Sequence, residues 1–103
     1  MSSPVHRLVM YRPKPGHEEQ LLAILKGHGP ALRNSGLITE QPVELYRATD
    51  LRKPEQGVCF VESFHWKDAT ASDLAHQMPE VMAVWETMGP HLEHMTLTTL
   101  SEI

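Results

Sequence analysis

Four stretches of the chain are short and rich in the β-branched and aromatic residues that favour strands. The first covers residues 5–12 and ends at a turn sequence rich in proline and glycine at 13–16. A second is strongest over residues 43–47, and a third, the most apolar, covers residues 58–66. Side chains alternate in character over residues 94–100, which predicts a fourth strand.

Two other stretches have the three- and four-residue spacing of a helix that buries one face. The residues that recur on one helical face are Leu21, Ile24, Leu25, His28 and Leu32 in the first stretch and Leu74, Met78, Val81, Met82, Trp85 and Met88 in the second. Pro30 has no N–H for the carbonyl four residues earlier, so we expect a kink or a 3₁₀ break there. Gly36 suits the left-handed position after the first helix. In the second region, residues 71–88, Pro79 either interrupts the helix or opens a new one.

The order of these elements is β-α-β-β-α-β, which is the ferredoxin-like arrangement of an α+β protein. This order predicts an antiparallel sheet with both helices on one face. A chain of 103 residues is long enough for one such unit, so we assign residues 1–103 to a single domain.

The strand at residues 58–66 has apolar side chains on both faces. Its odd positions hold small residues that suit close packing under helices, and its even positions hold Phe60, Phe64 and Trp66. We therefore expect these rings on the face without helices, where so large an apolar patch needs a cover. A second copy of the chain is the simplest cover, which predicts a homodimer. The alternative is that the rings face the chain's own helices and are ordinary core.

Composition narrows the class of partner. The nine Lys and Arg residues are scattered and the net charge is −4, which argues against a nucleic-acid-binding surface. No apolar run approaches the length that spans a bilayer, and the N-terminus lacks a signal-peptide pattern, so we expect no membrane partner. A single cysteine cannot form an internal disulfide, which favours a cytoplasmic location.

Two residues are candidates for acid–base chemistry. Glu62 lies among the rings of the third strand, and a carboxyl in apolar surroundings tends to keep its proton, as a general acid or base near neutral pH requires. The alternative is a structural ion pair with Arg7 or Arg47. His76 follows soon after Trp66, and a neutral imidazole there suits proton removal from a phenol or enol. The alternative is a histidine on the helix surface or at a helix cap.

No pattern in the sequence requires a metal or a cofactor. The seven histidines are scattered and no HExxH pattern or its reversed form occurs, so we predict no metal site. There is no phosphate-binding glycine loop, nucleophile elbow or CxxC pair, so we predict no cofactor. Cys59 has no paired base in view and is expected to be an inert, buried thiol.

Several short motifs lie at the ends of the predicted elements. They are Phe64-His65-Trp66-Lys67-Asp68, Ala75-His76-Gln77-Met78-Pro79-Glu80-Val81-Met82, Met88-Gly89-Pro90 and the opening turn Pro15-Gly16-His17-Glu18-Glu19. Together they resemble the antibiotic biosynthesis monooxygenase-like family of dimeric α+β barrel proteins, over nearly the whole chain. The resemblance implies a homodimer with a cavity in each subunit. Some members oxidise phenols with dioxygen and no metal or flavin. Others oxidise quinols, degrade haem, isomerise small metabolites or have no known activity.

The resemblance also implies which residues line the cavity. In the phenol-oxidising members these include the Trp of the third strand and the polar residue four positions before it, which correspond here to Trp66 and Glu62. Those members have Asn at the position of Glu62 and Tyr at the position of Ser72. We expect a small apolar or aromatic ligand to contact Trp66, Phe64, Phe60, Met82 and Trp85, with His76 and Glu62 as the catalytic residues.

Three functions remain open at this stage. The first is a cofactor-independent monooxygenase that acts on phenol- or quinol-type substrates. The second is a non-catalytic ligand-binding or stress-related homodimer with the same fold. The third is a structural homodimer whose cavity is filled by its own side chains.

Overall fold

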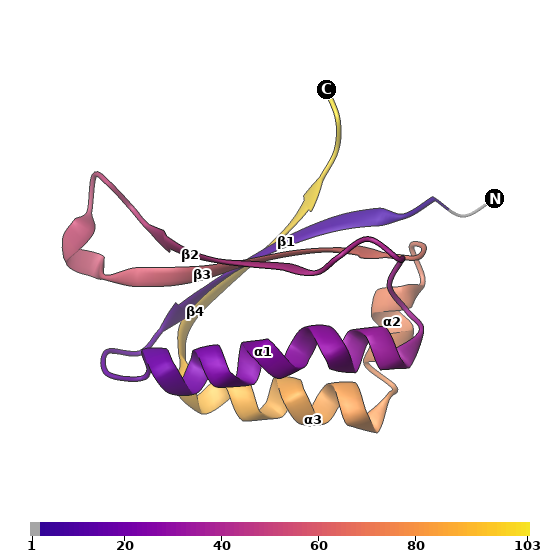
Figure 1. The fold of residues 1–103 in the computed structure, drawn as a ribbon, viewed down its shortest axis with the longest axis horizontal. Helices are drawn as coiled ribbons and strands as arrows, with labels where there is room; N and C mark the ends of the chain where they lie inside the picture. The colour runs from indigo at the N-terminus through magenta and orange to yellow at the C-terminus, as the bar shows by residue number, and fades with distance from the viewer. Residues whose placement is uncertain (1–2) are drawn as a thin grey trace.

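The computed structural model describes residues 3–103 as a sheet with helices packed against one side (Figure 1). The strands are β1 (Val5–Pro13), β2 (Glu44–Thr49), β3 (Val58–Trp66) and β4 (Leu92–Leu100). The helices are α1 (Glu18–Ser35), α2 (Ala71–Ala75) and α3 (Pro79–Met88), with 3₁₀ turns η1 (Pro54–Gln56) and η2 (Gly89–His91). The predicted ferredoxin-like order is confirmed, with the second helical region divided into α2 and α3.

The sheet has the strand order β2-β3-β1-β4, and each neighbouring pair is antiparallel. In the centre of the sheet, Val9 of β1 lies opposite Glu62 of β3 on one side and Leu97 of β4 on the other. The register between β1 and β4 shifts between Arg12 and Pro13, where the proline has no N–H for the ladder. The sheet therefore has β2 and β4 as its two edge strands.

Helix α1 follows the predicted periodicity and buries Leu21, Leu25, His28 and Leu32. It continues through Pro30 as a single α-helix, without the expected 3₁₀ break. Pro30 is exposed, so the missing hydrogen bond lies on the solvent side, where water can replace it.

Prolines and glycines end or begin the helices as their chemistry requires. Gly36 has φ 75° and donates its N–H to the carbonyl of Arg33, as predicted for the residue after the helix. Pro79 is the first residue of α3, after an extended Met78, so this proline opens a helix. Thr70 precedes α2 without a side-chain cap, because its hydroxyl donates to Asp68 instead.

The large rings of β3 face the helices, which shows that the expectation of an uncovered aromatic face was wrong. Phe60, Phe64 and Trp66 are 1%, 3% and 3% exposed within a single chain. The Phe64 ring meets the His28 ring of α1 edge-on, with 6.1 Å between centroids. Large side chains fill the space between sheet and helices, and the small side chains of β3 point to the opposite face. The alternative interpretation of these rings as core is the correct one.

The opposite face of the sheet is free of helices within residues 3–103 (Figure 1). Its apolar side chains include Met10, Tyr46 and Leu100, which are 40%, 53% and 42% exposed. We call this surface the open face; it also carries Leu8 and Val61, together with His6 and His65, whose rings stack at 4.1 Å. The open face therefore combines apolar side chains with polar ones such as Thr96, Thr98 and Glu44.

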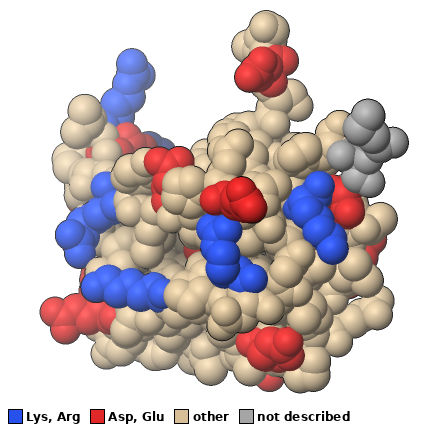
Figure 2. Space-filling model, turned by 45° about the vertical axis from the view of Figure 1, so that its right-hand side comes forward, with Lys and Arg blue, Asp and Glu red and all other residues tan. Residues whose placement is uncertain are grey.

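The molecular surface has a mixed distribution of charge. Figure 2 shows blue Lys and Arg side chains interspersed with red Asp and Glu side chains over the visible face. Within residues 3–103, no helix combines the length and apolar character needed to cross a membrane.

Candidate functional site

A cavity of about 360 Å³ lies between the sheet and the helix layer. β1 contributes Arg7, Val9 and Tyr11 to its wall, and β4 contributes Met95 and Leu97. This volume falls within the usual range for small-molecule sites, roughly 300–1,000 Å³. The space between sheet and helices is therefore not completely filled by the chain's own side chains.

A row of rings forms much of the cavity wall. Neighbouring rings along the row are His76, Trp85, His28, Phe64 and Trp66, and all five line the cavity. The His76–Trp85 and Phe64–Trp66 centroids are 4.9 Å apart, and His28 lies 6.1 Å from both Trp85 and Phe64. The Phe64–Trp66 pair is edge-to-face at 87°, a favourable geometry for aromatic rings. The wall thus offers flat, rigid surfaces suited to a planar apolar ligand.

Behind this wall, Glu62 is fully buried and bonded to two side chains. The Tyr11 hydroxyl donates to Oε1 of Glu62 at 2.7 Å. Nδ1 of His28 lies 2.9 Å from both carboxyl oxygens. A buried carboxyl needs such partners, because leaving it unpaired costs several kcal/mol. Neither Arg7 nor Arg47 pairs with Glu62, so the expected arginine partner is replaced by His28 and Tyr11.

The hydrogen bond from Trp85 fixes the protonation of His28. An indole N–H can only donate, and Nε1 of Trp85 lies 2.7 Å from Nε2 of His28. Nε2 must therefore be the acceptor, which places the ring proton on Nδ1, facing Glu62. His28 is then a neutral imidazole, and the network runs in one direction from Trp85 through His28 to the carboxylate.

Tyr11 responds to the same carboxylate from the other side. Burial, followed by the charge of Glu62 and the hydrogen bond to it, raises the pKa of the Tyr11 phenol well above its ordinary value. The phenol therefore keeps its proton throughout the physiological range and serves as a permanent donor to Glu62.

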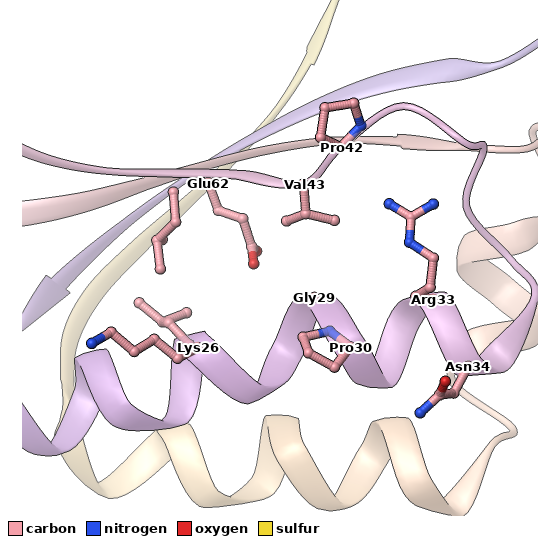
Figure 3. A pocket seen from close by; sticks show the side chains of 10 residues that line it. Lys26, Gly29, Pro30, Arg33, Asn34, Pro42, Val43 and Glu62 are labelled. Carbon is pink, nitrogen blue, oxygen red and sulfur yellow. The ribbon is translucent and has the colours of Figure 1, made fainter.

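A second hollow, of about 570 Å³, lies between α1 and the segment that leads into β2 (Figure 3). Glu62 reaches it from the sheet, and Lys26, Pro30 and Arg33 line its α1 side. These three residues are exposed, so this hollow is an open surface groove. The guanidinium of Arg33 donates to the carbonyls of Thr39 and Gln41, which holds the loop before β2 against α1.

The structure brings together only part of the predicted site. Trp66, Phe64, Trp85 and His76 line the cavity, and the His76 side chain lies in the exposed part of the wall. Phe60 and Met82 are not among the lining residues, and Glu62 lies behind the wall.

Sequence reasoning missed His28 and Tyr11 as site residues. A signal was available for both. His28 occupies a buried position in the apolar spacing of α1, and Tyr11 occupies the face of β1 that alternation assigns to the core. A polar group at a core position requires a polar partner.

Within residues 3–103, no three His, Cys, Asp or Glu side chains come together in a set able to hold a metal ion. Four of the five histidines outside the cavity form two pairs. One is the His6–His65 stack, and the other joins Nδ1 of His17 to Nδ1 of His91 at 2.9 Å.

Comparisons with known proteins identify the fold. No family model matches the sequence, and no curated protein matches it. Among solved structures, Rv0793 from Mycobacterium tuberculosis has a TM-score of 0.75 at 20% identity, with 98% of this chain and 96% of that chain covered. PA3566 from Pseudomonas aeruginosa has a TM-score of 0.75 at 17% identity, with 100% and 97% covered.

A further similar structure is named as an antibiotic biosynthesis monooxygenase. Its TM-score is 0.72 at 16% identity, with 96% of this chain and 98% of that chain covered. The protein is thus an α+β protein with a ferredoxin-like sheet. More narrowly, its fold is similar to that of this antibiotic biosynthesis monooxygenase, which agrees with the resemblance of the sequence motifs.

Proposed function

We propose that this protein binds a small aromatic molecule in the cavity between sheet and helices and oxidises it with dioxygen, as a cofactor-independent monooxygenase of phenol- or quinol-type substrates. The single observation that carries this proposal is the ring-lined cavity of about 360 Å³, which has a titratable side chain, His76, in its exposed wall. The likeness in fold to a protein named as a monooxygenase supports the choice of reaction.

His76 is the residue that manages the substrate proton in this proposal. It lines the cavity and lies against Trp85, with ring centroids 4.9 Å apart. A substrate stacked on Phe64 and Trp66 would share the cavity with this imidazole. Glu62 acts from behind the wall as a positioning residue, because its carboxylate fixes the orientation of His28 and Tyr11.

The reaction balances without a further reductant. Removal of the phenol proton gives an electron-rich anion whose ring carbon can donate an electron to dioxygen. In the keto tautomer of the substrate, this ring carbon is a CH₂ group. The reaction replaces its two C–H bonds with one C=O bond. This four-electron oxidation matches the reduction of dioxygen to the new carbonyl oxygen and one water.

A second candidate is a non-catalytic ligand-binding protein of the same fold, and one observation favours it. The donors to Glu62 come from Tyr11 and His28, so this carboxylate is satisfied within the protein, and it does not line the ring-lined cavity. In this candidate, the network stabilises the fold and the cavity only binds.

The homodimer predicted from the sequence is retained in the proposal, with a different surface. The open face, rather than the aromatic face of β3, would pair with a second copy. Its support is the strip of apolar side chains around Met10, Tyr46 and Leu100, which no helix covers within residues 3–103. A cytoplasmic location also remains part of the proposal.

Dioxygen uptake tests the enzymatic proposal. We expect a panel of naphthols, anthrones and quinols to include a substrate whose turnover consumes one dioxygen per product. With ¹⁸O₂, one labelled oxygen should appear in the product carbonyl. His76→Ala should lower kcat by about 100-fold, within the usual range for loss of a general base.

His94→Ala is the matched control, because His94 is an exposed histidine on β4 that does not line the cavity. It should leave turnover unchanged. If some of these compounds bind saturably but none of them causes dioxygen uptake, the enzymatic proposal is rejected in favour of the non-catalytic one. Equal turnover by wild type and His76→Ala would remove the assignment of His76.

A further inference from the structure

The cavity wall contains hydrogen-bond donors that the protein itself does not satisfy. Within residues 3–103, Nε of Arg7 and Nε1 of Trp66 are buried and have no hydrogen-bond partner. Both side chains line the cavity. Buried polar groups without partners are uncommon in folded proteins, and a binding role is one explanation for those that occur.

The two donors lie at the same part of the sheet. Arg7 is opposite Phe64 in the β1–β3 ladder, and Trp66 is two residues further along β3 on the same face. Arg7 and Trp66 are therefore diagonal cross-strand neighbours, a spacing that long side chains can bridge. The Ser72 hydroxyl also belongs to the cavity wall.

Arg7 is the charged side chain of this part of the wall, and it is half-buried. No carboxylate in the described part of the chain lies within ion-pair distance of the Arg7 guanidinium. Glu62, the buried carboxylate nearby in the sheet, is already bonded to Tyr11 and His28. The remaining wall is mainly apolar and includes Val9, Met88 and Leu92.

We propose that the ligand of this cavity carries a carboxylate, which binds Arg7 and the indole N–H of Trp66, on an aromatic body that packs against the rings. The inference rests on the proposed binding function of the cavity and names the class of ligand. Arginine and indole only donate, so the ligand group must accept hydrogen bonds. A planar carboxylate matches the two-pronged geometry of a guanidinium.

Binding of matched probes tests the inference without any need for turnover. The probes are 2-naphthoate and its neutral analogue 2-naphthamide, measured by titration calorimetry against the full-length protein. We expect naphthoate to bind at least about 10-fold more tightly, as charge-assisted hydrogen bonds are typically worth that much. Trp66→Phe keeps a ring and removes the N–H, and it should weaken naphthoate more than naphthamide.

Arg7→Gln should abolish the preference for naphthoate, and Arg7→Lys, which keeps the charge but not the planar fork, should retain part of it. Arg52→Gln is the control, because it removes the same charge from an exposed loop residue outside the cavity.

Equal affinity for the two probes, an unchanged preference in Arg7→Gln, or no binding of either probe would overturn the inference. If Arg7→Gln does not fold, the Arg7→Lys and Trp66→Phe variants test the inference in its place. Naphthoate preference without any dioxygen uptake would leave the inference intact and reject only the enzymatic proposal.

Discussion

Glu62 is the residue whose environment most shapes the interior of this protein. It is fully buried, and Tyr11 and His28 both donate to its carboxyl group. The Trp85 indole, in turn, fixes which nitrogen of His28 carries the proton. Four side chains from β1, α1, β3 and α3 therefore form one polar network across the core, and the network ties both long helices to the sheet.

Removing one donor from this network should destabilise the protein. Tyr11→Phe keeps the ring but leaves Glu62 with one donor fewer, and we expect the free energy of unfolding to fall by about 1–3 kcal/mol. Urea denaturation followed by far-UV circular dichroism measures this change.

Thr87→Val is the control for this substitution. The Thr87 hydroxyl is exposed on α3 and donates only to the carbonyl of Val84, so the loss of this hydroxyl should change stability by less than about 0.5 kcal/mol. Equal effects of the two substitutions would contradict a stabilising role for the Glu62 network.

The candidate site was only partly predictable from the sequence at this scale. Trp66, Phe64, Trp85 and His76 were expected at the ligand site; all four line the cavity, and their contact with a ligand stays a prediction. The partners of Glu62 were not foreseen, because His28 is 34 residues away along the chain and Tyr11 is 51 away. Single-sequence patterns report local spacing and cannot specify which distant polar group meets another.

At the scale of elements, glycines and prolines determine where the helices begin and end. Pro79 opens α3, and Gly36 follows α1 in a left-handed conformation. These boundaries were predictable because they depend on local backbone chemistry. The direction in which β3 points its rings was not predictable in the same way, because both faces of that strand are apolar and packing against α1 decides between them.

Two glycine substitutions should therefore have opposite effects on stability. Gly27 lies within α1, where an added Cβ meets nothing within 4 Å, so Gly27→Ala should stabilise the protein by about 0.5–1 kcal/mol. Gly36 has φ 75°, so Gly36→Ala should destabilise it by about 1–2 kcal/mol. Thermal or urea unfolding gives both values, and changes of the same sign would contradict this account of the helix end.

At the scale of the whole molecule, the two faces of the sheet are used differently. One face packs against the helices and encloses the cavity, and the open face carries exposed apolar side chains without a cover in the described chain. The sequence predicted that the aromatic face of β3 pairs with a second copy, and the pairing that we propose uses the open face instead.

Association through the open face can be tested with a charge placed in its centre. We expect the wild type to sediment with twice the chain mass of 11.7 kDa. Met10→Glu puts a charge on the apolar strip and should shift the protein to the monomer, because burying an unpaired charge is unfavourable.

Leu51→Glu introduces the same chemical change at a loop position that is 89% exposed. It should leave the mass unchanged. A wild-type protein that sediments as a monomer at high concentration, or a Met10→Glu variant that still sediments with the doubled mass, would rule out pairing through this face.

The Glu62 network and the cavity are each formed by residues of a single chain, and this has a consequence for pairs made of two different copies of the chain. Tyr11, His28 and Trp85 all come from the same polypeptide as Glu62. In the proposed homodimer, a pair formed by two diverged copies of this chain would keep both cavities intact, each with its own ligand preference. Pairing with a copy whose cavity is blocked would halve the number of binding cavities and leave the other cavity unchanged.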